Sequence, residues 1–267
     1  MKKLIVVFIV ALLWSHPAGA EPKVDKEKYH LLGSVQKIVT ETAKLTDKFG
    51  KSTEEKRMLS ETATFDAKGN LTEEDVYDVD GTINSKAVYS YDTKENKAEE
   101  VSYKPRWRFF DGPVDSKDVY TYDEKGNLVE ESSYNPDGAL KSKTIYTRDA
   151  KGYLIEEAFY NPNGTLKSKI INTYDAKGNK TEEAVYNAEG TLRTKTVSTY
   201  DEKGNKVEED FYNPDLRRKE TYTYQSDSLG NWNKRTTSTW VTKFGRSYFE
   251  PSLVTYRTIT YYGEAAK

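Results

Sequence analysis

A repeat of 26 residues is the feature that most constrains how this 267-residue chain can fold. The turn motif D-x-K-G-N places glycines at positions 69, 126, 152, 178 and 204, and Gly230 continues the series in a variant of that turn. Glu95 takes the glycine position in one copy, and a five-residue insertion explains the single step of 31 residues. Because such a repeat is one supersecondary unit, the sequence predicts a stack of similar units along the chain.

A second turn follows each first turn by twelve residues, as in the sequence NPDG at residues 135–138. Proline presets the first central residue of a type I turn, and the glycine suits the left-handed position of the bulge that follows. This is the chemistry of three-residue hairpins. The segments between the turns are rich in Tyr, Val, Ile, Thr and Phe, which favour strands. Each repeat is therefore predicted to be two strands and two turns.

These patterns predict an all-β fold, an antiparallel meander of about eight hairpins that forms a twisted or spiralling sheet. About sixteen strands are expected, with residues 35–45 first and residues 253–262 last. The predicted organisation is a signal peptide at 1–20, a flexible N-terminal segment at 21–33, a single repeat domain at 34–262 and a tail at 263–267.

The turns also predict which residues face one another across the strands. Tyr134 is expected opposite Leu140, Tyr122 opposite Leu128, Tyr120 opposite Glu130, and Glu131 opposite Lys143. The second Glu of each Glu-Glu pair then pairs with a Lys twelve residues later, or seventeen across the insertion. The predicted pairs are Glu74 with Lys86, Glu100 with Lys117, Glu131 with Lys143, Glu157 with Lys169 and Glu183 with Lys195, and the series fails at Glu209, opposite Thr221.

The first twenty residues have the three parts of a secretory signal: Lys2 and Lys3, an apolar run from Leu4 to Trp14, and the small-residue sequence AGA before Glu21. The apolar run is too short to span a bilayer, no later stretch is apolar enough to do so, and no Cys follows for a lipoprotein anchor. A periplasmic or secreted protein without a membrane span is therefore expected.

Several function classes are disfavoured by composition. Without the signal, 39 basic residues stand against 43 acidic ones, which argues against a nucleic-acid partner. The chain has no Cys, and His30 would be the one histidine of the processed form, so thiol, Ser-His-Asp and His-based metal chemistry are not expected. We predict no catalytic residues, no metal and no cofactor.

The motifs YTYDEKGNL at 120–128, YDAKGNK at 174–180 and YDEKGNK at 200–206 resemble the Rhs/YD-repeat family over roughly residues 60–262. The tail YRTITYY at 256–262 looks like the end of small exported members. The resemblance implies a hairpin sheet coiled into a spiral wall, and large members are described as carbohydrate-binding shells around a toxin. This chain has too few hairpins for such a shell. NPNGTLK at 161–167 is also similar to MORN-type repeats.

Two regions are candidate binding sites. The first is an aromatic and acidic sheet face that carries the Glu row of Glu130, Glu156 and Glu182 beside Tyr120 and Tyr146, with no Lys expected opposite these carboxylates. Such a strip could stack on sugars, or its hydroxyls could simply satisfy the carboxylates. The second is the insertion at 104–113, where aromatic and Arg residues of the kind that dominate binding hot spots break the repeat. Its candidate residues are Arg106, Trp107, Arg108, Phe109 and Phe110.

These features favour an exported, non-enzymatic protein that binds carbohydrate or another cell-surface partner through one of these regions. The alternative is a structural protein that self-associates through exposed sheet edges. A glycoside-active enzyme ranks third, because adjacent residues such as Glu130 and Glu131 point to opposite faces and cannot flank one bond.

Overall fold

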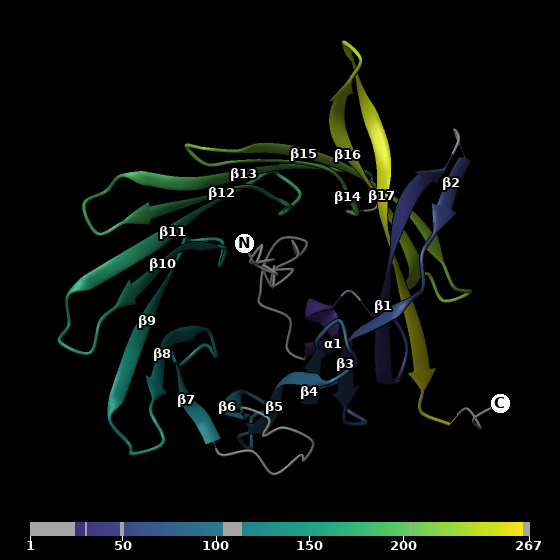
Figure 1. Cartoon of the computed structure of the whole chain (residues 1–267). Helices are drawn as coiled ribbons and strands as arrows, with labels where there is room; N and C mark the ends of the chain where they lie inside the picture. The colour runs from purple at the N-terminus through teal and green to yellow at the C-terminus, as the bar shows by residue number, and fades with distance from the viewer. Residues whose placement is uncertain (1–24, 30, 49–50, 104–113, 203, 264–267) are drawn as a thin grey trace.

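The computed structural model describes residues 25–29, 31–48, 51–103, 114–202 and 204–263 (Figure 1). Within them lie one short helix and a continuous run of antiparallel strands. The elements are α1 (Asp25–Lys28), β1 (Val35–Lys48), β2 (Lys51–Glu54), β3 (Met58–Phe65), β4 (Leu71–Tyr77), β5 (Ile83–Tyr91), β6 (Lys97–Tyr103), β7 (Val114–Tyr122), β8 (Leu128–Tyr134), β9 (Leu140–Arg148), β10 (Leu154–Tyr160), β11 (Leu166–Tyr174), β12 (Lys180–Asn187), β13 (Leu192–Tyr200), β14 (Lys206–Tyr212), β15 (Arg217–Ser226), β16 (Trp232–Lys243) and β17 (Arg246–Tyr261).

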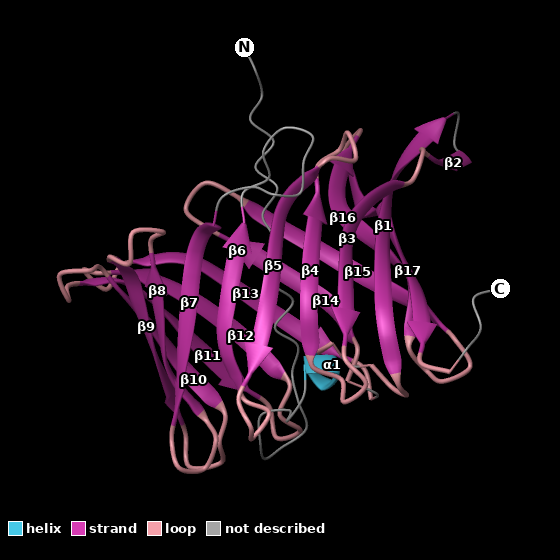
Figure 2. Cartoon of the chain, turned by 90° about the horizontal axis from the view of Figure 1, so that it is seen from below, coloured by secondary structure: helices cyan, strands magenta, loops and turns pink. Residues whose placement is uncertain are grey.

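The sheet closes on itself into an antiparallel barrel (Figures 1 and 2). Each strand from β3 to β17 pairs with the next, and β1 pairs with β3 on one side and β17 on the other. Sixteen of the described strands form the ring, while β2 extends beyond it as a partner of the end of β1. The all-β prediction holds, but the predicted twisted or spiralling sheet is wrong, because the sheet is a closed barrel.

Closure has a physical reason in the repeat itself. Nearly every hairpin carries a register shift beside its turn, where one strand holds an extra residue. Such bulges bend the strand and increase its twist. Open, strongly twisted sheets rarely exceed about ten strands without curling, and joining the first strand to the last satisfies the backbone groups of both edges.

The turns have the predicted geometry. In the first type, Gly126 N–H donates to the carbonyl of Asp123 at 3.0 Å and Gly126 has a φ of 84°. In the second type, Gly138 N–H donates to the carbonyl of Asn135 at 2.9 Å with a φ of 81°. Glu95 adopts a φ of 68° at the position that glycine takes elsewhere. A type I turn followed by a left-handed bulge residue is thus the connection at both ends of the barrel.

The register prediction is correct beside each turn and wrong beyond it. Tyr134 lies opposite Leu140 and Tyr122 opposite Leu128, as expected. Past the bulge, however, Glu131 lies opposite Tyr120 and Thr144. The bulge residue adds one position to one strand only, so all pairs beyond it move by one residue. A shift of one exchanges the two faces of a strand.

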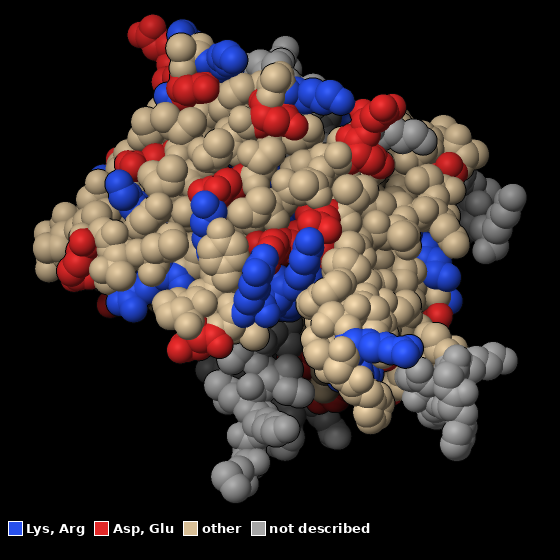
Figure 3. Space-filling view, turned by 90° about the horizontal axis from the view of Figure 1, so that it is seen from above, with Lys and Arg blue, Asp and Glu red and all other residues tan. Residues whose placement is uncertain are grey.

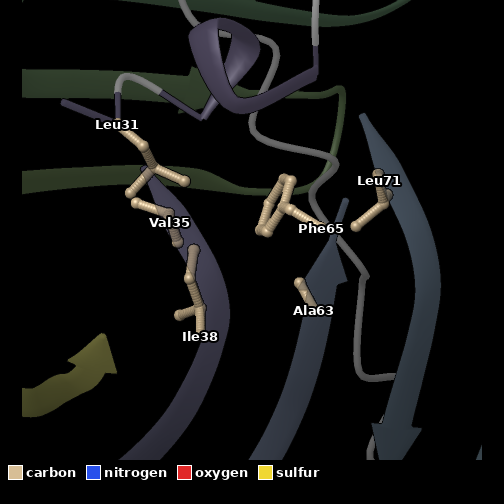
Figure 4. Close-up of a cluster of buried hydrophobic side chains, with 6 residues drawn as sticks. All are labelled: Leu31, Val35, Ile38, Ala63, Phe65 and Leu71. Atoms are coloured by element: carbon tan, nitrogen blue, oxygen red, sulfur yellow. The ribbon is translucent and has the colours of Figure 1, made fainter. Parts of the chain in front are cut away.

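A hydrophobic cluster anchors the N-terminal segment inside one end of the barrel (Figures 1 and 4). Tyr29, just after α1, packs edge-on against Phe65 at 5.5 Å between ring centroids. The cluster consists of Leu31, Val35, Ile38, Ala63, Phe65 and Leu71. Phe65 is 1% exposed, and full burial of such a side chain contributes about 1.5–3 kcal/mol.

Polar contacts hold α1 to the first D-x-K-G-N turn. The Lys26 N–H donates to the carbonyl of Gly69 at 2.9 Å, and the Leu71 N–H donates to the Asp25 carboxylate at 3.1 Å. Among the described residues, no helix is long and apolar enough to cross a membrane.

Candidate functional site

The inner wall of the barrel carries a repeated pairing of tyrosine with glutamate. Tyr29, which follows α1 in the lumen, donates its hydroxyl to Glu74 at 3.1 Å, so the face that bears Glu74 is the inner one. Residues along a strand alternate between faces, and this assigns the other strands. The repeated bonds are Tyr89 to Glu74 at 3.0 Å, Tyr120 to Glu100 at 2.8 Å and Tyr146 to Glu131 at 2.7 Å, with Asn172 to Glu157 at 3.3 Å in the next repeat.

Burial sets the protonation behaviour of these pairs. It raises the pKa of the Glu100, Glu131 and Glu157 carboxyls, while the hydroxyl of Tyr120 and the ammonium of Lys97 oppose the shift at Glu100. Burial, followed by the nearby carboxylates, raises the pKa of the Tyr120 hydroxyl as well. The tyrosines therefore stay protonated and act as hydrogen-bond donors.

A second row of inner tyrosines fixes the wall near the D-x-K-G-N end. Each donates its hydroxyl to the backbone carbonyl of the first residue of another strand. The bonds are Tyr91 to Leu71 at 2.6 Å, Tyr122 to Lys97 at 2.9 Å, Tyr174 to Leu154 at 2.9 Å, Tyr200 to Lys180 at 2.8 Å and Tyr224 to Lys206 at 2.9 Å. This row presents rings to the lumen while its hydroxyl protons stabilise the strand ends.

A cavity of about 710 Å³ lies at this end of the barrel, beside α1. Two neighbouring turns and the strand ends next to them form its lining, together with Asp25 of α1. The lining residues are Asp25, Tyr91, Asp92 and residues 94–97 and 120–128. The ammonium of Lys97 lies 4.2 Å from the ring centroid of Tyr89 and 5.6 Å from that of Tyr120. Rings, carboxylates, amides and the half-buried ammonium of Lys97 thus surround a single polar space.

The turn aspartates of the cavity have structural partners. Asp92 accepts bonds from the backbone of Lys94 and Asn96, and Asp123 accepts them from Lys125 and Asn127. Donation from the backbone and side chain of the turn Asn lowers the pKa of both carboxyls. They therefore hold the turns as carboxylates, which leaves the tyrosine rings and the outer ends of Glu124 and Lys125 to meet a ligand.

The outer wall carries a ladder of ion pairs, seen as adjacent red and blue groups on the side of the barrel in Figure 3. The first Glu of each Glu-Glu pair, rather than the second, contacts the Lys of the following strand. Two of the second Glu residues, Glu183 and Glu209, contact Lys180 and Lys206 within their own strands. The pairs between strands are Glu73–Lys86 at 2.6 Å, Glu99–Lys117 at 2.8 Å, Glu130–Lys143 at 2.8 Å, Glu156–Lys169 at 3.3 Å, Glu182–Lys195 at 2.5 Å and Glu208–Lys219 at 2.9 Å. The predicted pairing of Glu131 with Lys143 is therefore wrong.

The structure separates the predicted site residues into three groups. Tyr120 and Tyr146 lie on the inner wall, and Tyr120 lines the cavity. The Glu row of Glu130, Glu156 and Glu182 lies on the outer wall in ion pairs with lysines. The insertion residues Arg106, Trp107, Arg108, Phe109 and Phe110 lie outside the described residues. The expected aromatic and acidic face exists, but its carboxylates are those of the second Glu row.

The sequence did not indicate that Asp25 and Lys97 line the cavity, or that Glu100 binds the hydroxyl of Tyr120 on the inner wall. The bulge glycine of each turn was the available signal, because a bulge moves the second Glu onto the tyrosine face. Asp25 reaches the cavity through the N-terminal segment, for which the repeat offers no guide. Within the described ranges, no cluster of three or more Asp, Glu, His or Cys side chains is arranged to hold a metal ion.

Comparison with known proteins supports the fold. No protein-family model and no curated protein sequence matches the chain. A porin-like protein from Bacteroides uniformis has a similar structure with a TM-score of 0.56 and 12% identity, covering 92% of this chain and 100% of that one. At this identity the likeness concerns the fold alone.

Two further structures share less with the chain. A porin-like protein from Bacteroides vulgatus has a TM-score of 0.38 and 10% identity, covering 85% of this chain and 99% of that one. The TcdB2–TccC3–Cdc42 complex has a TM-score of 0.32 and 13% identity, covering 85% of this chain and 14% of that one. TM-scores this low support no conclusion about the fold of the chain. The spiral wall implied by the Rhs/YD resemblance is replaced here by a closed barrel.

Proposed function

We propose that this chain is a non-enzymatic binding protein of the cell envelope, and that the cavity beside α1 holds a hydroxyl-rich ligand such as an oligosaccharide. The observation that carries the proposal is the lining of that cavity, where Tyr91, Tyr120 and Tyr122 meet carboxylate and amide groups. Ligand sites are concave and combine apolar surface with a few placed polar groups. Aromatic rings cover the CH faces of a sugar, while carboxylates and amides bond its hydroxyls.

The inner wall is prepared for such a ligand before it binds. The hydroxyl of Tyr120 is oriented by Glu100, and its oxygen still has a lone pair to accept a bond from a sugar hydroxyl. Lys97 sits against the rings of Tyr89 and Tyr120, which limits the freedom that binding would otherwise remove. Such preorganisation lowers the entropic cost of association.

The test is glycan-array screening of the purified protein, followed by calorimetric titration of the best ligand. Tyr120→Phe removes one polar group of the cavity and is expected to weaken binding about tenfold, as loss of a buried partner does. Tyr146→Phe is the matched control, because Tyr146 makes the same bond to an inner Glu one repeat later and does not line the cavity. Equal loss in both variants, or an array without any ligand, would overturn the proposal. Hydrolysis of the bound glycan would favour the glycoside-active alternative.

A second candidate function is passage of solutes through the barrel, favoured by the closed wall with a polar inner face and by the fold shared with the porin-like protein. It ranks below binding because a membrane-spanning wall needs an apolar outer band, and each Lys at mid-bilayer costs about 2–4 kcal/mol. Six outer-wall lysines stand in ion pairs among the described residues. Conductance of the protein in a planar bilayer would favour solute passage over ligand binding.

Assembly through sheet edges is a further alternative. Ring closure pairs β1 with β17 from Val35 to Lys44, so the edges that a partner copy would use belong to the hairpins beyond the ring. Light scattering that gives a monomer at micromolar concentration would exclude this alternative.

A further inference from the structure

The hairpin of β16 and β17 extends past the barrel wall (Figures 1 and 2). Its tip carries exposed aromatic side chains. Phe244 occupies the first central position of its two-residue turn and is 104% exposed. Trp240 and Tyr248, on the two strands of the same hairpin, are 46% and 42% exposed. The tip thus presents three large aromatic side chains to solvent.

The turn at this tip has a residue pair that is unfavourable for a two-residue hairpin. Phe244 has a φ of 52° and Gly245 a φ of 74°, a pair of left-handed residues that favours Asn-Gly over Phe-Gly. Lys243 and Arg246 lie directly opposite each other across the turn, and the ion pair of Lys243 with Glu250 at 2.6 Å offsets the repulsion between these like charges. Backbone strain combined with a fully exposed aromatic side chain points to a role outside the fold.

A second hairpin at the same end of the barrel has the same tip sequence. Residues 48–51 read KFGK and residues 243–246 read KFGR, although positions 49 and 50 lie outside the described residues. Lys48 pairs with Lys51 as Lys243 pairs with Arg246. The two hairpins continue from β1 and β17, which are neighbours in the wall up to the pair of Lys44 and Leu253. Neither tip belongs to the 26-residue repeat.

We propose that the β16–β17 hairpin tip docks on the surface of an anionic lipid bilayer. Aromatic side chains favour the interface between headgroups and acyl chains, and basic residues beside them are attracted to anionic headgroups. Phe244 at the apex, with Arg246 next to it and Trp240 behind it, matches this chemistry. A membrane that meets the β16–β17 tip leaves the ion-paired outer wall in water.

Vesicle co-sedimentation of the full chain tests the proposal, with phosphatidylglycerol-containing vesicles compared with pure phosphatidylcholine. The protein is expected to bind the anionic vesicles, and 0.5 M salt is expected to weaken binding. Phe244→Gly should lower partitioning about tenfold or more. The same change should leave the melting temperature equal or higher, because glycine adopts positive φ without strain. Arg246→Glu should lower binding to anionic vesicles only.

Val79→Gly provides the control. Val79 is 77% exposed in a turn at the same end of the barrel but has acidic neighbours, so its loss should leave binding unchanged. Failure of the unmodified protein to bind anionic vesicles would overturn the proposal. Equal binding by Phe244→Gly, equal loss in Val79→Gly, or a fall in melting temperature that accounts for the lost binding would also overturn it.

Discussion

Asn231 is the side chain by which the last turn of the repeat holds the N-terminal segment. Its amide donates to the carbonyl of Leu32 at 3.0 Å and to the hydroxyl of Tyr261 at 2.7 Å, and its oxygen accepts the Leu32 N–H at 2.7 Å. Asn127, at the same repeat position, instead donates to the carboxylate of Asp123 at 2.8 Å in an exposed turn. The two positions therefore form a matched pair for mutation.

Asn231→Ala removes three hydrogen bonds at a side chain that is 1% exposed. Each such bond contributes about 0.5–1.5 kcal/mol net, and buried partners left without a bond cost more. We expect a loss of about 3 kcal/mol in the free energy of unfolding, which lowers the melting temperature by roughly 6–12 °C for a domain of this size. Asn127→Ala should cost about 0.5–1 kcal/mol, since water replaces its bond.

Urea unfolding followed by far-ultraviolet circular dichroism gives both values, with an unchanged slope expected for each variant. The reasoning fails if the two variants lose the same free energy within about 0.5 kcal/mol. That result would mean that the N-terminal segment contributes nothing to the stability of the barrel.

Three further predictions concern single side chains. Glu95→Gly should raise the free energy of unfolding by about 1 kcal/mol in urea, because it removes a left-handed non-glycine residue while the lost surface ion pair contributes little. Burial, aided by a neighbouring carboxylate, raises the pKa of Glu61 to about 7, so the protein should lose stability as pH rises from about 4.5 through 7. Glu61→Gln should therefore melt higher than the unmodified protein at pH 8 and not at pH 4. Phe65→Ala should cost about 3–5 kcal/mol, measured by thermal unfolding.

The candidate site was only partly predictable. The alternation of Tyr and Glu correctly indicated an aromatic and acidic face, and Tyr120 lies on it. The choice of carboxylate was wrong, because Glu130 faces outward and Glu131 faces the lumen. The error traces to one bulge residue per turn, which reverses the faces of all residues beyond it.

The sequence by itself determined the period, the turns and the strands, because these depend on local backbone preferences. Gly126 and Gly138 adopt the left-handed conformation that their turns require, and the pairs next to the turns are those expected. Such preferences act over a few residues and repeat with the motif.

Only the tertiary structure decided that the sheet closes and which of its faces becomes the lumen. Closure pairs Val35 with Tyr261, residues from opposite ends of the chain, and places α1 and Asp25 inside the ring. The curvature that brings these ends together is a sum of small bends over sixteen strands, and no single repeat encodes it. The cavity exists because these bends add up, since its lining joins two repeats and the N-terminal segment around one space.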